Sequence, residues 1–65
     1  MTLTVNGVPA DLADGYTVGD LVRARTDERK VAVARNGEVV PRGAWDSTVL
    51  EPGDAVEILI AVAGG

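Results

Sequence analysis

The 65-residue sequence contains no cysteine and no histidine. Without cysteine, the chain can form neither a disulfide nor a thiolate metal site. Without histidine, it lacks the side chain most often used as a general base near neutral pH, which is also the commonest metal ligand. An enzyme is therefore the least expected function class, because few side chains remain that could carry out catalysis.

The sequence is also poor in aromatic residues and in long apolar runs. Tyr16 and Trp45 are the only aromatic residues, so the core of one small domain must rest on valine, leucine and isoleucine. No segment approaches the roughly 20 apolar residues of a membrane span, and the first residues lack the pattern of a signal peptide. We therefore expect a cytoplasmic protein that does not contact membranes.

Basic residues are in the minority, six against ten acidic residues, which gives a net charge of −4. This charge repels phosphate backbones and disfavours a nucleic-acid partner. It suits a protein partner with a basic face, although an acidic surface also serves solubility alone. The acidic residues do not follow the spacing of a calcium loop, and no glycine stretch matches a phosphate-binding loop. We expect no metal and no bound cofactor.

The first Asn-Gly pair predicts a β-hairpin at the start of the chain. Residues 2–5 alternate between polar and apolar, and Asn6 with Gly7 tolerates the positive φ angles of a tight turn. Residues 8–12 would form the returning strand, and Pro9 confines that strand to an edge of the sheet.

The second Asn-Gly pair, at Asn36, predicts another hairpin of the same kind. Its strands are the alternating stretch from Val31 and the pair Val39-Val40, which Pro41 ends. The following stretch is too irregular for a long element, and we expect Trp45 to pack over the core.

The stretch YTVGDLVRAR, residues 16–25, predicts the main helix. Thr17 and Asp20 have the spacing of a capping box, with aspartate in place of the usual glutamate. An apolar stripe at helical spacing would face a sheet. Its positions are Val18, Leu21, Val22 and Arg25.

The most apolar stretch, AVEILIAVA, predicts a long interior strand beside the first strand and parallel to it. Val56, Ile58, Ile60 and Val62 would share its core face. Leu59 then lies on the less buried face, where we predict a contact with a partner. Glu57 and Asp54 are further candidates for docking on a basic partner, and the alternative is that they are solvated charges.

These elements predict an α+β fold: a small roll with a mixed sheet of four to five strands and one main helix. The sequence then ends in AVAGG, directly after the predicted strand. Glycine lets a backbone pass through a narrow channel, and a terminal carboxylate can attack the α-phosphate of ATP. From the glycine pair alone, a frayed end without function is an equal alternative.

The stretches VAVARNGEVVPRGAW and LEPGDAVEIL, together with AVAGG, resemble the ThiS family, the sulfur carriers of bacterial thiamine biosynthesis. The resemblance covers nearly the whole chain. It implies a single ubiquitin-like β-grasp domain over residues 1–65 with a flexible Gly-Gly tail. The N-terminal half, with VNG and TVGDLV, is shared with many β-grasp proteins. The segment NGEVVPR followed by Trp45 favours the thiamine branch over the small subunit of molybdopterin synthase.

The resemblance also implies a reaction cycle in which the chain is a carrier and not a catalyst. An E1-like adenylyltransferase of the ThiF type would use ATP to adenylate Gly65, while Gly64 lets the tail thread into that enzyme. A persulfide relay, fed by a cysteine desulfurase or a similar donor, would produce a thiocarboxylate. Thiazole synthase would then accept the sulfur. Two alternatives stay open, a non-covalent β-grasp binding module and a ubiquitin-like modifier joined to lysine.

Overall fold

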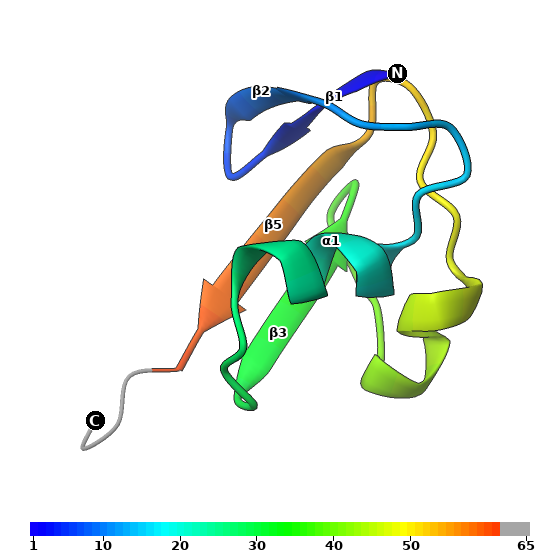
Figure 1. Cartoon of the computed structure of the whole chain (residues 1–65). Coiled ribbons are helices and arrows are strands. Elements are labelled where there is room, and N and C mark those ends of the chain that lie inside the picture. Colours follow the sequence, from blue (N-terminus) through cyan, green and yellow to red (C-terminus); the bar gives the residue numbers. More distant parts are fainter. Residues whose placement is uncertain (62–65) are drawn as a thin grey trace.

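The computed structural model describes residues 1–61, in which an α-helix crosses one face of a mixed five-stranded sheet (Figure 1). The strand order is β2-β1-β5-β3-β4, so the final strand is central. It runs parallel to β1 and antiparallel to β3. The elements are β1 (Thr2–Val5), β2 (Val8–Asp11), α1 (Val18–Arg25), β3 (Val31–Arg35), β4 (Glu38–Val39), a 3-10 helix η1 (Arg42–Ser47) and β5 (Ala55–Ile60).

Both predicted hairpins are confirmed, and each turns on its Asn-Gly pair. Asn6 and Asn36 have φ angles of 52° and 51°, and the glycines that follow them also have positive φ. The first returning strand, β2, lies at a sheet edge as its proline predicts. The second, β4, is only two residues long, although the N–H of Val40 still donates to the carbonyl of Val33 at 2.8 Å.

The predicted capping box fixes the start of α1. The Thr17 hydroxyl accepts from the backbone N–H of Asp20 at 3.1 Å, and the Asp20 carboxylate accepts from the N–H of Thr17 at 3.0 Å. These two bonds satisfy backbone donors that the first turn of a helix leaves unpaired. The bond that the Asp20 carboxylate accepts from the Thr17 backbone is also the main reason why the pKa of Asp20 is lowered.

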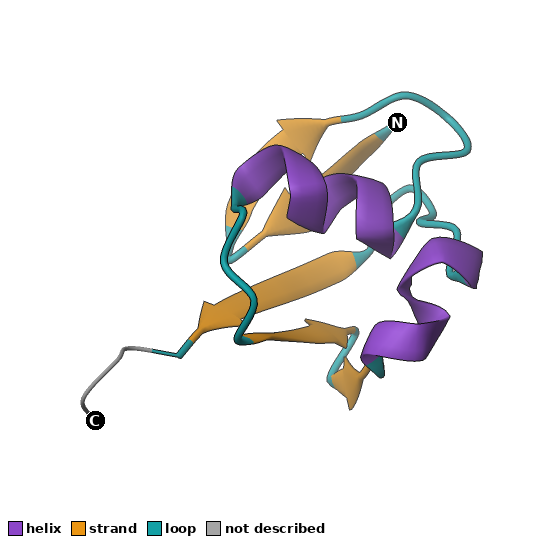
Figure 2. Cartoon of the chain, turned by 60° about the horizontal axis from the view of Figure 1, so that its bottom comes forward, coloured by secondary structure: helices purple, strands orange, loops and turns teal. Residues whose placement is uncertain are grey.

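The core lies between the sheet and the two helices, which sit next to each other in Figure 2. Trp45 is buried, as predicted, and its Nε1–H donates to the carbonyl of Val40 at 2.9 Å. This bond removes the cost of burying the indole N–H. The buried apolar residues are Leu3, Val5, Val18, Leu21, Val22, Val33, Trp45, Leu50, Val56 and Ile58.

Two predicted core-facing positions are exposed. Arg25 ends the helical stripe in solvent, and Ile60 on β5 is 46% exposed. The cause for Ile60 is that β1 pairs with β5 only at Ala55 and Val56, so the end of β5 extends beyond that neighbour. Val62 lies outside the described residues. Over residues 1–61, no helix is long and apolar enough to cross a membrane.

Candidate functional site

Strand β5 carries the chain towards the predicted functional tail. β3 pairs with β5 as far as Val31 and Ile60, and the N–H of Ala61 then donates to the carbonyl of Lys30 at 2.9 Å. β5 ends at the side of the molecule away from the N-terminus (Figure 1). Gly64 and Gly65, the residues predicted to act, lie outside the described residues. The structure therefore describes the strand that precedes the tail.

The asparagines of the two hairpin turns hold β5 from both sides. The Asn6 amide accepts from the N–H of Ile58 at 2.8 Å and donates to the carbonyl of the same residue at 3.2 Å. The Asn36 amide accepts from the N–H of Ala55 at 2.9 Å. Both asparagines therefore extend the backbone pairing of β5 with side chains, which fixes the strand before the tail begins.

Asp54, at the start of β5, is buried and fully engaged within the chain. One carboxylate oxygen accepts from Arg35 Nε and from the N–H of Glu51, each at 2.8 Å, and the other accepts from Asn36 at 3.0 Å. Burial alone would raise the pKa of Asp54, but the hydrogen bonds from Asn36, Glu51 and Arg35 outweigh it and lower that pKa.

The burial of Asp54 corrects two expectations, because neither a docking contact nor a solvated charge would be 6% exposed. Burial of this carboxylate depends on Arg35, which lies 19 residues earlier in the sequence and could not be identified as its partner from local patterns. We therefore assign Asp54 to the support of β5 and not to a partner surface.

Leu59 and Glu57 lie on the outer face of the sheet, where they were expected. Leu59 is 62% exposed and pairs with Ala32, while Glu57 pairs with Ala34. The next strand adds Val39, opposite Ala34 and 76% exposed. The outer face therefore presents an apolar patch, Ala32, Ala34, Val39 and Leu59, beside one carboxylate.

Of the residues in this patch, the sequence predicted only Leu59 as a contact. Alternation along each strand indicated which residues share a face, but the sequence did not give the register that sets Val39, Ala34 and Glu57 side by side. The sequence feature that indicated the patch was the run of valines and alanines in the second hairpin, because its alternating residues lie on both faces of the sheet.

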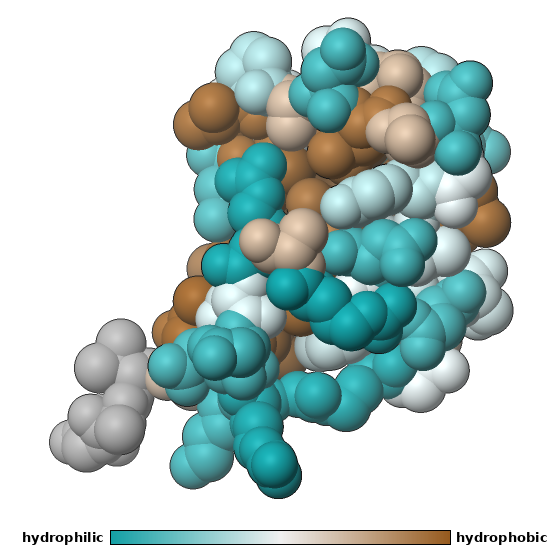
Figure 3. Space-filling model, in the orientation of Figure 1, coloured by the Kyte–Doolittle hydropathy of each residue, from teal (hydrophilic) through white to brown (hydrophobic). Residues whose placement is uncertain are grey.

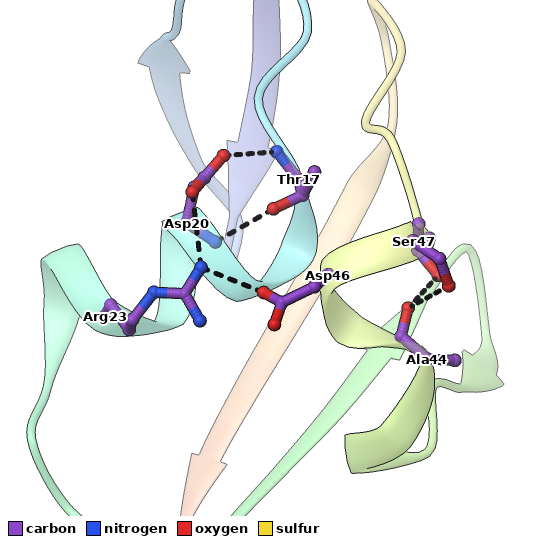
Figure 4. A network of polar contacts seen from close by, with 7 residues as sticks. Thr17, Asp20, Arg23, Ala44, Asp46 and Ser47 are labelled. Atoms are coloured by element: carbon purple, nitrogen blue, oxygen red, sulfur yellow. Dashed lines mark hydrogen bonds and ion pairs between the residues drawn. The ribbon is translucent and has the colours of Figure 1, made fainter.

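A network of polar contacts joins α1 to η1 on the helical side (Figure 4). Arg23 donates to Asp46 at 2.9 Å and to Asp20 at 3.3 Å. Gly19 permits this approach, because a Cβ on Gly19 would collide with the Asp46 carboxylate. The network is exposed and joins one arginine to two aspartates, so it keeps one net negative charge and links the two helices.

The described residues contain no arrangement suited to catalysis by a metal. No group of three His, Cys, Asp or Glu residues within 1–61 could hold an ion. A surface depression of about 440 Å³ lies between the second hairpin and η1, but the charged side chains of Arg35, Glu51 and Asp54 along it bind one another.

Comparison with known proteins agrees with this architecture. The model of the ThiS family matches residues 3–65. The crystal structure of a thiamine biosynthesis protein (ThiS) from Geobacter metallireducens is 42% identical, with a TM-score of 0.84 and complete coverage of both chains. The solution structure of that thiamine biosynthesis protein gives a TM-score of 0.81 at 43% identity, over 100% of this chain and 88% of the other. The fold is therefore the β-grasp, as the resemblance implied.

Two kinds of curated relatives differ in length. The sulfur carrier protein ThiS of Escherichia coli is 31% identical over the full length of both chains. The thiazole synthase of Paramagnetospirillum magneticum is 36% identical over all of this chain, but the chain spans only 20% of that protein. The match to the family model, together with the full-length relative, shows that the chain belongs to the ThiS family.

Proposed function

We propose that this chain is a sulfur carrier of thiamine biosynthesis that works through the carboxylate of Gly65. Membership of the ThiS family carries the proposal. One further feature supports it: the Gly-Gly pair follows a strand that the Asn6 and Asn36 side chains hold on both sides. The chain is then a co-substrate of partner enzymes.

The proposed cycle begins with ATP bound by a ThiF-type adenylyltransferase. An oxygen of the Gly65 carboxylate attacks the α-phosphorus, and pyrophosphate leaves. The terminal sulfur of a persulfide, charged by a cysteine desulfurase or a similar donor, attacks the acyl carbon and displaces AMP. A thiol then cleaves the sulfur–sulfur bond, which leaves the thiocarboxylate on Gly65 and a disulfide on the relay. Thiazole synthase accepts the sulfur.

Each part of the described fold has a place in this cycle. The Asn6 and Asn36 contacts fix β5, the strand that precedes the tail. Glycine has no Cβ, so Gly64 can pass through a narrow channel. Leu59 and its apolar neighbours, with Glu57 beside them, form the surface that docks on the partner.

The direct test is the intact mass of the chain, with Gly65 as its last residue, after incubation with ATP, the ThiF-type enzyme and a sulfur source. We expect a shift equal to one oxygen replaced by sulfur, mapped to Gly65 by fragmentation. An unchanged mass, with the enzyme shown to be active on another carrier, would overturn the proposal in favour of a binding module. Conjugates with lysine would instead indicate a modifier.

A further inference from the structure

The six basic residues divide into two classes by their contacts. Arg23 forms ion pairs with Asp20 and Asp46, and Arg35 forms ion pairs with Glu51 and Asp54. The other four are exposed and form no ion pair with any residue in the described range 1–61. They are Arg25, Arg29, Lys30 and Arg42, and we call them the basic surface.

The basic surface lies along and beside the connection from α1 to β3, which meets the end of β5. Lys30 is adjacent to the end of β5, because its carbonyl accepts from the N–H of Ala61. Arg42 is held beside Arg29, whose carbonyl accepts from the Arg42 guanidinium. Figure 3 shows strongly hydrophilic side chains at this lower end of the molecule, next to the end of β5.

Arg42 is also fixed in orientation. Its guanidinium carbon lies 4.6 Å from the centre of the Trp45 ring, which is a cation–π distance. The contact leaves this charge in solvent on the rim of a depression of about 340 Å³ that Arg29 also lines. One of the four charges, that of Arg42, is therefore held by contacts that do not neutralise it.

The charge of this end is opposite to that of the rest of the molecule. Asp27, Glu28 and Asp46 all line the depression, and Asp46 is paired with Arg23. The four cations of the basic surface against Asp27 and Glu28 give 4 − 2 = +2 at this end. Seven further acidic residues lie elsewhere in the sequence, in a chain whose net charge is −4. The domain therefore has a positive end at the tail and a negative remainder.

We propose that the basic surface docks against an acidic rim around the channel through which the activating enzyme receives the tail. The inference rests on the proposed function and specifies the partner's chemistry. A positive end at the tail and a negative body would orient the carrier tail-first in the partner's field, which raises the rate of productive encounter. The negative body disfavours a nucleic acid as the occupant.

The net charge of the chain led us to expect a basic partner surface, and an acidic partner surface at the tail is the opposite. A net negative chain predicts a basic partner face, but the distribution of charge places an acidic partner face at the tail. Glu57 lies on the outer face of the sheet, on another part of the surface.

The test compares two double variants that both lower the net charge by two. Arg29→Gln/Lys30→Gln removes charge from the basic surface but leaves both backbone carbonyl contacts possible. Ala13→Glu/Ser47→Glu adds the same negative charge at exposed positions elsewhere. The measurement is kcat/KM for ATP-dependent pyrophosphate release by the ThiF-type enzyme of the same organism, at roughly 0.02 M and roughly 0.5 M salt.

We expect the first variant to lower kcat/KM by roughly tenfold at low salt, mainly through KM, with the difference lost at high salt. We expect the control to stay within about twofold. If the two variants lowered kcat/KM equally, the proposed docking of the basic surface would be overturned. Adenylation of the wild type in the same assay would still support the proposed function. No adenylation of the wild type would overturn both. Arg25→Gln, at a residue without a described side-chain hydrogen bond, provides an independent second variant.

Discussion

Asn6 binds both backbone groups of Ile58, a residue 52 positions later, with the two ends of its side-chain amide. The same residue supplies the positive φ angle of the first hairpin turn. One asparagine thus makes the turn and continues the pairing between β1 and β5 by one further residue. A glycine could make the turn and keep the bond from the backbone N–H of residue 6 to Val56, but it could not bind Ile58.

This double role predicts that Asn6→Gly lowers the free energy of unfolding by about 1–2 kcal/mol, because two hydrogen bonds are lost and the turn is kept. For a domain of this size, the loss corresponds to a decrease of roughly 5–15 °C in Tm. Hydrogen exchange provides the local test: the amide of Ile58 should lose more protection than the amide of Val33. Equal losses at both amides would contradict the proposed contact.

The buried carboxylate of Asp54 predicts acid sensitivity. Its pKa is lowered in the folded state, so its contribution to stability is complete above the unfolded pKa, near 3.9, and is lost as the pH falls towards the folded pKa. We expect the free energy of unfolding to decrease below about pH 4. Asp20, whose pKa is also lowered, adds to the decrease with the same sign.

Asp54→Asn should separate these contributions. The variant should be less stable at pH 7 by about 2 kcal/mol, because Arg35 loses its charged partner in a partly buried position. It should also lose less stability than the wild type between about pH 4 and pH 2. Denaturant titrations at several pH values measure both quantities, and parallel pH profiles for the two proteins would argue against this assignment.

Gly19 and Asp46 should show strong coupling in a double-mutant cycle. Gly19→Ala gains helix propensity of about 1 kcal/mol, but its Cβ displaces the Asp46 carboxylate and breaks the bond to Arg23. We expect little net change in stability from this single substitution. In an Asp46→Ala background, the same substitution should stabilise the domain by about 0.5–1 kcal/mol. Additive effects would show that the contact is unimportant.

Leu59 should contribute to activation without contributing to stability. Because its side chain is 62% exposed, Leu59→Ser should change the free energy of unfolding by less than about 0.5 kcal/mol. If the apolar patch docks on the activating enzyme, kcat/KM for adenylation should fall by roughly tenfold. Val49→Ser is the matched control, since Val49 is 51% exposed and lies outside the patch. Similar losses in both variants would exclude a specific docking role.

Gly64→Phe should impair adenylation by roughly tenfold or more and leave thermal unfolding unchanged, because the bulky side chain obstructs a narrow channel. Adding one alanine after Gly65 should abolish sulfur transfer, since the carboxylate is displaced from the reacting phosphate. The readouts are pyrophosphate release and intact mass. A normal rate for Gly64→Phe would remove the channel argument while leaving the carrier role intact.

The sequence by itself determined the features that depend on residues within about four positions of each other. The two Asn-Gly turns, the Thr17–Asp20 capping box and the edge position of β2 are all of this kind. Local chain geometry allows few alternatives for such patterns. The apolar composition of β5 likewise indicated its central place, since only a strand with two neighbours buries so many apolar residues.

The tertiary structure alone decided which distant residues meet. Arg35 buries Asp54, Asn6 holds Ile58, and the carbonyl of Lys30 anchors Ala61. Each contact depends on strand register and loop path, which are set by the packing of the whole core and not by local preference. The same packing exposes Ile60 beyond the end of β1 and places Arg42 beside Arg29. The composition determined the net charge, but only the fold determined where the charged side chains lie.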